Sequence, residues 1–183
     1  MDILDLIGKR QSCRNYQDKP LSREQIMTCL EAARLAPSAC NSQPWKFVVV
    51  DDQEKKAQLA DCLYDPLMKI NKFALKAPVF IVVVNEKRNF TSKFGEITKK
   101  QDYSSIDIGI AAENICLTAT EMGLGSCIIG WFKEEKIKTL LQIPEARRVR
   151  LVIALGYPDE NDLLRKKSRY NLEEIVYFNQ YSK

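Results

Sequence analysis

The pattern of hydrophobic and polar positions along the chain predicts strands separated by helices. Trp45–Val50 is a mostly apolar run, and Val79–Val84 is a continuous one rich in β-branched residues. The second run is typical of a strand that is buried on both faces of a sheet. Further strands are predicted at Cys127–Ile129 and Arg150–Leu155, so the candidate strands come from both halves of the chain.

Helical periodicity and helix-end signals account for most of the remaining positions. Ser22 can cap a helix, and Gln25 three residues later completes a capping box. Gly123 suits the left-handed residue that often ends a helix. The predicted helices are Met1–Gly8, Ser22 to about Ala36, Asp51–Leu63, Pro66–Lys76, Asp102–Met122 and Lys133–Leu141.

The predicted helix Asp102–Met122 is apolar or small-residue around most of its circumference. We expect it to be buried, either in the core or at a subunit interface. The polar, aperiodic stretch Glu86–Lys100 is expected to be an excursion from the fold or a lid. Because the chain shows no repeat, low-complexity segment or linker, residues 1–183 are predicted to form a single domain.

Composition narrows the class of protein. Hydrophobic residues make up 45% and charged residues 28% of the 183 positions, as in ordinary globular proteins. The net charge of +4 is spread along the chain, which argues against nucleic acid as a partner. The longest apolar run, Ala77–Val84, is far shorter than a membrane span of about 20 residues, and the first ten residues do not resemble a signal peptide. The sequence therefore predicts a soluble, cytoplasmic protein.

The cysteine and histidine contents restrict the chemistry. The six cysteines include no C-x-x-C pair, so zinc and iron–sulfur sites lack local support. Without export the thiols are expected to stay reduced and to pack as small core residues. The sequence contains no histidine, which excludes Ser-His-Asp and Cys-His nucleophile systems and the usual zinc hydrolase sites. Catalysis would therefore use a cofactor or depend on carboxylates, lysines, arginines and backbone groups.

Two polar segments could bind a ligand. Lys9–Arg14 places a serine between two arginines, and such guanidinium groups match the oxygens of a phosphate. The same stretch could equally be a solvated basic end of a helix. Pro37–Trp45 carries amides and hydroxyls between two prolines and could read the edge of a heterocycle. Most loops of this kind are only connections.

Two later segments are also candidates. Gly123–Trp131 lacks the glycine spacing of a dinucleotide fingerprint and the Lys-Ser or Lys-Thr of a P-loop. It predicts a helix end and a strand that stops at Gly130, where bare backbone could approach a ligand. Lys166–Val176 begins with cations and continues into a short amphipathic turn. Taken alone, it could be a solvated surface.

In this order the segments resemble the nitroreductase family of FMN enzymes. The resemblance lies in R-x-S-x-R, P-S-A-x-N-x-Q-P-W, G-L-G-x-x-x-x-G and K-x-R-x-x-L-E-E-I-V, and it extends from Arg10 to Val176. It implies an α+β fold in which helices flank a central, mostly antiparallel sheet. It also implies an intertwined homodimer with flavin sites at the subunit interface.

The resemblance implies a role for each matched residue. The FMN phosphate would be held by Arg10, Ser12, Lys167 and Arg169, with Gln11 beside them. Arg14 would lie near the pyrimidine edge of the flavin and tune it. The remaining cofactor-binding candidates are Ile128, Ile129 and Gly130 along the ring, with backbone amides toward N5 and O4, then Pro37, Ser38, Asn41 and Gln43 from the other subunit, and Asn71.

The implied activity is transfer of hydride from NADH or NADPH through the flavin to a nitroaromatic, quinone or similar electrophile. The flavin would carry the hydride itself, so no protein side chain need be catalytic, and the two substrates would take turns in a ping-pong mechanism. Two alternatives stay open: a reductive dehalogenase or enone reductase of the same fold, and a flavin-binding protein without turnover. The chain is short for the family, and Asn85–Gln101 has no recognisable pattern, so the sequence leaves the substrate open.

Overall fold

The structure is a computed structural model that describes residues 2–86 and 101–181. In its centre is a four-stranded antiparallel sheet with the strand order β1-β2-β4-β3. The strands are β1 (Trp45–Val50), β2 (Val79–Asn85), β3 (Gly125–Ile129) and β4 (Arg148–Gly156). The fold is therefore α+β with an antiparallel sheet, as the resemblance implied.

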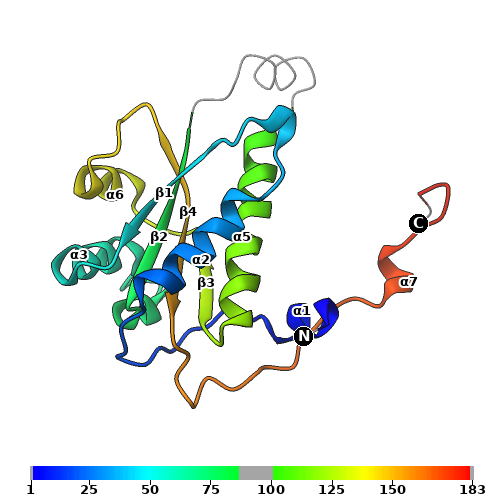
Figure 1. The fold of residues 1–183 in the computed structure, drawn as a ribbon, viewed down its shortest axis with the longest axis horizontal. Coiled ribbons are helices and arrows are strands. Elements are labelled where there is room, and N and C mark those ends of the chain that lie inside the picture. The colour runs from blue at the N-terminus through cyan, green and yellow to red at the C-terminus, as the bar shows by residue number, and fades with distance from the viewer. Residues whose placement is uncertain (1, 87–100, 182–183) are drawn as a thin grey trace.

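Helices cover both faces of this sheet (Figure 1). One face carries α2 and α5, and the other carries α3 and α6. The helices are α1 (Ile3–Lys9), α2 (Arg23–Arg34), α3 (Gln53–Leu63), α5 (Tyr103–Glu121), α6 (Glu134–Leu141) and α7 (Leu172–Ile175), with the 3₁₀ turns η1 (Ala39–Asn41) and η2 (Lys72–Lys76).

Strand β2 connects the two halves of the core. Phe80 and Val82 point into the cluster under α3 and α6, while Ile81 and Val83 point into the cluster under α2 and α5. All of these side chains are buried, which confirms the prediction of a strand covered on both faces. Alternation along a central strand thus builds two cores from one apolar run.

Local end signals also act as predicted. The Ser22 hydroxyl accepts from the backbone N–H of Gln25, and the Gln25 side chain accepts from the Ser22 N–H, so the capping box is present. Gly123 has φ +71° and ends the turn after α5 in the left-handed region. Helix α2 stops at Arg34, two residues before the predicted end.

The predicted helix Pro66–Lys76 is wrong. Only η2 at its end is helical, because the Asp65 carboxylate accepts from the backbone N–H groups of Leu67 and Met68, each at 3.0 Å, and folds the chain into a turn. Backbone hydrogen bonds of 3.1 and 3.2 Å between Asp65 and Ile70 close that turn. A carboxylate that captures nearby N–H groups competes with a helix in this way. The predicted excursion Glu86–Lys100 lies, apart from Glu86, outside the described residues.

Helix α5 is buried on one side only. Ile108, Ala111 and Ile115 pack into the core, whereas Ile106 and Ile110 are exposed. The segment after β4 continues past α1 and then leaves the body of the molecule, so α7 projects outward (Figure 1). Its apolar side chains, like those of α1, are exposed in this chain. No helix among residues 2–86 and 101–181 is long and apolar enough to span a membrane.

Candidate functional site

Cations from the two ends of the chain meet beside α1. The Lys167 ammonium donates to the backbone carbonyls of Ile7 and Arg10, at 2.7 Å each. Burial lowers the pKa of Lys167, and the charges of Arg10 and Arg169 lower it further, so all three cations lie close together. The Arg10 Nε lies 3.3 Å from the Glu113 carboxylate, which is the ion pair seen in this group. Such an excess of positive charge favours a multivalent anion.

The segment after Arg10 runs along β3. Ser12 forms a parallel bridge with Ser126, and the Cys13 N–H donates to the Ser126 carbonyl at 2.8 Å. Gly125 permits this approach, because a Cβ at that position would lie 2.6 Å from the Cys13 Sγ. The missing side chain therefore places the R-x-S-x-R segment against the strand.

The side chains of Ser12 and Arg14 lie close to the thiol of Cys127 on β3. Burial raises its pKa, while the nearby charge of Arg14 and a hydrogen bond with Ser12 act in the opposite direction. Arg165 lies beside them: its guanidinium donates to the Asp162 carboxylate at 2.6 Å and to the Ser12 carbonyl. The structure thus gathers Ser12, Arg14 and Arg165 at the middle of β3.

The outer edge of β3 is open beyond Ser126. Backbone groups along a strand alternate between its two edges, so Ile128 presents its N–H and C=O to the same edge as Ser126, and Gly130 follows. No strand among the described residues pairs with this edge beyond the bridge to Ser12. Ile128 is 41% exposed and a Cβ on Gly130 would meet nothing within 4 Å, whereas Ile129 is 2% exposed and packs in the core. The backbone here can approach a flat ligand.

The loop from Pro37 to Pro44 is a stiff, separate element. The Ala39 N–H donates to the Asp107 carboxylate at 3.1 Å, and the Ser38 hydroxyl accepts from the Gln43 N–H at 2.9 Å. The Gln43 amide donates to the Asn41 side-chain oxygen at 3.1 Å. Asn41 and Gln43 have φ of 51° and 45°, in the left-handed region. These bonds fix the loop without any ligand.

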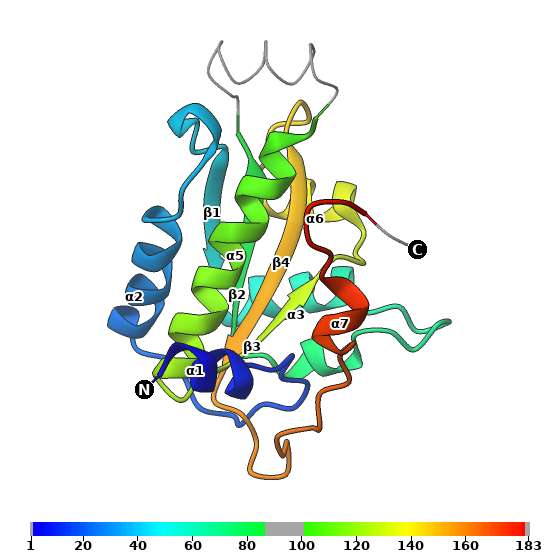
Figure 2. The ribbon, with the colours of Figure 1, turned by 90° about the vertical axis from the view of Figure 1, so that its right-hand side faces the viewer.

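Within one chain this loop is far from the cationic cluster that Arg10, Lys167 and Arg169 form. It lies at the N-terminal end of α5, while α1 lies toward the other end of that helix (Figures 1 and 2). The predicted site residues therefore form two groups: one around Arg10 and β3, and one in the Pro37–Gln43 loop.

Gln11 and Asn71, two of the predicted cofactor-binding residues, use their side-chain amides for hydrogen bonds within the chain. The Gln11 amide donates to the carbonyls of Asp162 and Leu163 at 3.2 Å and accepts from the Arg165 N–H at 3.1 Å, so it fixes the C-terminal segment. The Asn71 amide donates to the carbonyl of Leu63 at 3.2 Å and to that of Trp131 at 3.1 Å. Asn71 thus contacts the residue that follows Gly130.

Five of the six cysteines are buried, and Cys40 in the loop is exposed. Burial raises the pKa of the Cys13 and Cys29 thiols to about 12 and that of Cys116 to about 11, so these side chains act as core residues. Residues 2–86 and 101–181 contain no group of three or more Cys, Asp and Glu side chains that could hold a metal ion.

Comparison with known proteins identifies the family. A model of the nitroreductase family matches residues 7–69 and 63–157, which is most of the chain. The chain belongs to the nitroreductase family. It is 38% identical over 179 residues to an Archaeoglobus fulgidus protein that carries the provisional name NADH dehydrogenase/NAD(P)H nitroreductase, with 95% of this chain and 96% of that protein covered.

Solved structures of the nitroreductase family agree with this assignment. An FMN-dependent nitroreductase from Clostridium difficile R20291 superposes with a TM-score of 0.76 at 31% identity, covering 98% of this chain and all (100%) of that one. A nitroreductase family protein from Streptococcus pneumoniae TIGR4 gives a TM-score of 0.82 at 31% identity, covering 96% and 99%. This nitroreductase family member is accordingly an oxidoreductase.

Several residues of the site carry no sequence signal. Glu113, Asp162 and Arg165 reach the R-x-S-x-R segment only through the fold. Trp131 belongs to the candidate segment Gly123–Trp131, but the sequence does not predict its contact with Asn71. A pattern of spacings identifies neighbours along the chain and not partners about 150 residues away, such as Gln11 and Leu163.

Proposed function

We propose that this nitroreductase family member is an FMN-dependent NAD(P)H oxidoreductase that works as a homodimer. The observation that carries the proposal is the cationic cluster Arg10–Lys167–Arg169 beside the open edge of β3. The whole chain, residues 1–183, would act as one flavin-binding domain in the cytoplasm. An FMN-dependent relative from Clostridium difficile supports the choice of cofactor.

The residues present fit the phosphate of FMN. Lys167 uses its ammonium to cap the carbonyl end of α1. Burial lowers the pKa of Lys167, and repulsion from Arg10 and Arg169 lowers it further. A phosphate carrying nearly two negative charges would relieve that repulsion. Ser12, next to Arg10 in the chain, would add a hydroxyl donor.

The residues present also fit the flavin ring. The backbone N–H groups of Ile128 and Gly130 lie at the open edge of β3 and have no strand partner in the described part of the chain. Arg14 reaches the middle of β3, where its charge would stabilise negative charge on the pyrimidine edge. When bound, the cofactor supplies the hydride chemistry, so the protein needs only to bind, orient and tune it. This division of labour suits a chain without histidine.

A second copy of the chain would complete the site. The Pro37–Gln43 loop is preformed and carries Ser38 and Asn41, yet its own chain holds it away from α1 (Figures 1 and 2), the helix that Arg10 follows. The exposed apolar side chains of α1, α7 and the outer side of α5 favour burial against another protomer. Arg10 would then serve one flavin together with the loop of the partner subunit.

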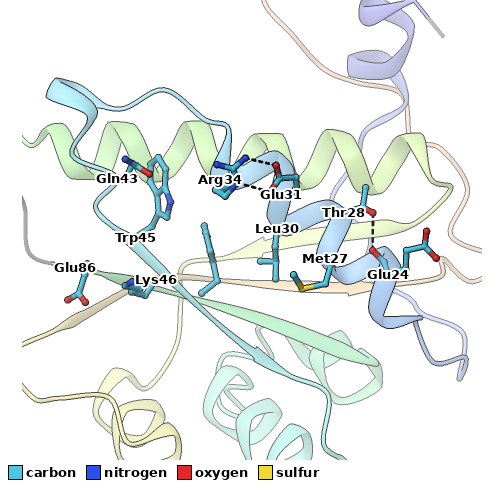
Figure 3. Close-up of a pocket in the computed structure, with 11 residues that line it drawn as sticks. Glu24, Met27, Thr28, Leu30, Glu31, Arg34, Gln43, Trp45, Lys46 and Glu86 are labelled. Atoms are coloured by element: carbon cyan, nitrogen blue, oxygen red, sulfur yellow. Dashed lines mark hydrogen bonds and ion pairs between the residues drawn. The ribbon is translucent and has the colours of Figure 1, made fainter.

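A groove between α2 and β1 could bind residues 172–181 of the second copy, the segment that includes α7 (Figure 3). The groove has a volume of about 840 Å³, and Met27, Leu30, Trp45 and Phe47 form its apolar lining. It borders β1, an edge strand of the sheet. Residues 172–181 are rich in exposed aromatic and aliphatic side chains, which match such a groove.

The function predicts three observations on the purified protein. Its visible spectrum should show bound flavin, identified as FMN after release, and it should oxidise NADH or NADPH when a quinone or nitroaromatic is added. Because one ring face would serve both substrates in turn, double-reciprocal plots should be parallel. Flavin without any NAD(P)H oxidation would instead identify a binding protein, and intersecting lines would require a ternary complex.

Loss of a phosphate contact should weaken the binding of FMN and leave the binding of riboflavin unchanged. A hydrogen bond to a charged group contributes about 1.5–3 kcal/mol, so Arg10→Ala and Arg169→Ala should each weaken FMN about tenfold to a hundredfold. Equilibrium dialysis measures both affinities. Riboflavin, which lacks the phosphate, is the matched control and should bind both variants as it binds the wild type. Full retention of FMN by both variants would disprove the assignment.

A further inference from the structure

Trp131 is an exposed tryptophan that the fold nevertheless holds in place. The chain has two tryptophans, and Trp45 is only 7% exposed, whereas Trp131 is 55% exposed. Indole rings normally lose most of their contact with water on folding, because their apolar surface is large. A half-exposed indole directly after Gly130 therefore calls for an explanation.

The turn Asp65–Asn71 fixes Trp131 from two directions. The Asn71 side chain donates to the Trp131 carbonyl at 3.1 Å. The Asp65 carboxylate accepts from the backbone N–H groups of Met68 and Leu67, each at 3.0 Å. These hydrogen bonds lower the pKa of Asp65, and the neighbouring Trp131 side chain lowers it further. One end of the turn thus holds the backbone of Trp131, and Asp65 at the other end lies beside its side chain.

The turn itself is rigid. The Asp65–Ile70 backbone pair closes it, and Asn71 enters η2 with φ 60°, in the left-handed region. A second link follows Trp131, where the Lys133 N–H donates to the Cys62 carbonyl at 3.0 Å. The ordering of the ring is therefore completed before any ligand arrives, which reduces the entropic cost of binding.

The segments on either side of Trp131 carry exposed apolar side chains. Leu67 and Met68 belong to the turn that Asp65 and Asn71 close, and Ile128 belongs to β3, which ends just before Gly130. Gly130 has free space where a side chain would stand. Trp131 therefore borders the strand edge to which the flavin ring is assigned, and it extends that edge with a flat apolar surface.

We propose that Trp131 is a specificity-determining residue, a preformed platform on which a flat, uncharged aromatic acceptor lies beside the flavin. Asp65 is its positioning residue. The proposal rests on the proposed function, since that function places the flavin next to Gly130. It names the substrate class more narrowly: ring-containing acceptors are bound through their π-face, and acceptors without a ring gain nothing from this surface.

The test measures binding of 4-nitrobenzyl alcohol to the purified oxidised holoenzyme by calorimetry. Trp131→Leu should weaken binding about threefold to tenfold, the range expected for loss of an aromatic pair, while Trp131→Phe should stay within about twofold of the wild type. Flavin content should be unchanged in both. In turnover, kcat/KM for the nitro compound should fall by the same factor in Trp131→Leu, and that for ferricyanide, which has no ring, should not change.

Asp65→Ala separates positioning from general damage. It should weaken binding of the nitro compound in the wild-type background. In the Trp131→Leu background it should have no further effect on binding, because the two residues act through the same ring. Equal binding by wild type and Trp131→Leu, with flavin retained, would overturn the proposal. The expected loss of binding in Trp131→Leu, together with no NAD(P)H oxidation by the wild type, would instead count against the proposed function alone.

Discussion

Two inactive variants, Arg10→Ala and Asn41→Ala, should recover about a quarter of the wild-type activity when they are co-expressed. Within one chain, α1, which Arg10 follows, lies away from the loop that carries Asn41, so a shared site takes these residues from different protomers. A mixed dimer then holds one site with both defects and one intact site. Random pairing makes about half of the dimers mixed, which leaves about a quarter of all sites intact. Activity per protomer in the co-purified mixture, relative to the wild type, measures this fraction.

A matched pair from the same cluster serves as the control. Arg10→Ala mixed with Arg169→Ala should recover nothing, because both residues belong to one chain's cationic cluster and every site then carries one defect. Differently tagged chains verify that mixed dimers form. If verified Arg10→Ala and Asn41→Ala heterodimers remain inactive, both residues act within one chain and the shared site is wrong.

Gly125→Ala should cost about 2–3 kcal/mol of the free energy of unfolding, as overpacking in a tight core does. The new Cβ would lie 2.6 Å from the Sγ and 2.7 Å from the Cβ of Cys13. Cys13 is 1% exposed and cannot swing away, so the segment that carries Ser12 and Arg14 must shift from β3. Urea unfolding at a fixed protein concentration measures the loss, and weaker flavin binding should accompany it.

The cause of that loss can be isolated with a second substitution. Cys13→Gly removes both atoms that the new methyl group would meet, so the double variant should recover part of the stability lost in Gly125→Ala. Gly8→Ala is the control glycine, because a Cβ there meets nothing within 4 Å and its effect should stay within about 1 kcal/mol. A Gly125→Ala variant as stable as Gly8→Ala would show that the close approach is not required.

Prediction from sequence succeeded where the deciding interactions are local. The Ser22–Gln25 capping box, the left-handed Gly123 and the β-branched run in β2 each depend on neighbours within a few residues. The segment Pro66–Lys76 failed because one carboxylate, Asp65, captured backbone groups that a helix would have used.

The site was predictable only in part, for the same physical reason. The four motifs contain Arg10, Ser12, Lys167 and Arg169, and the structure brings the three cations together. No spacing rule could have added Glu113 or Arg165, whose contacts depend on how α5 and the C-terminal segment pack. The placement of the Pro37–Gln43 loop away from the cluster is likewise a tertiary property.

The residues of the cationic cluster are synthesised at widely separated times during translation. Arg10 emerges first, whereas Lys167 and Arg169, which complete the cluster, emerge after all four strands. At about 5–20 residues per second, the intervening stretch takes on the order of ten seconds or more to synthesise. The sheet can therefore begin to form on the nascent chain while the phosphate-binding group does not yet exist. Cofactor loading would then be a late event in the life of the polypeptide, and bound flavin would report that the C-terminal segment has docked.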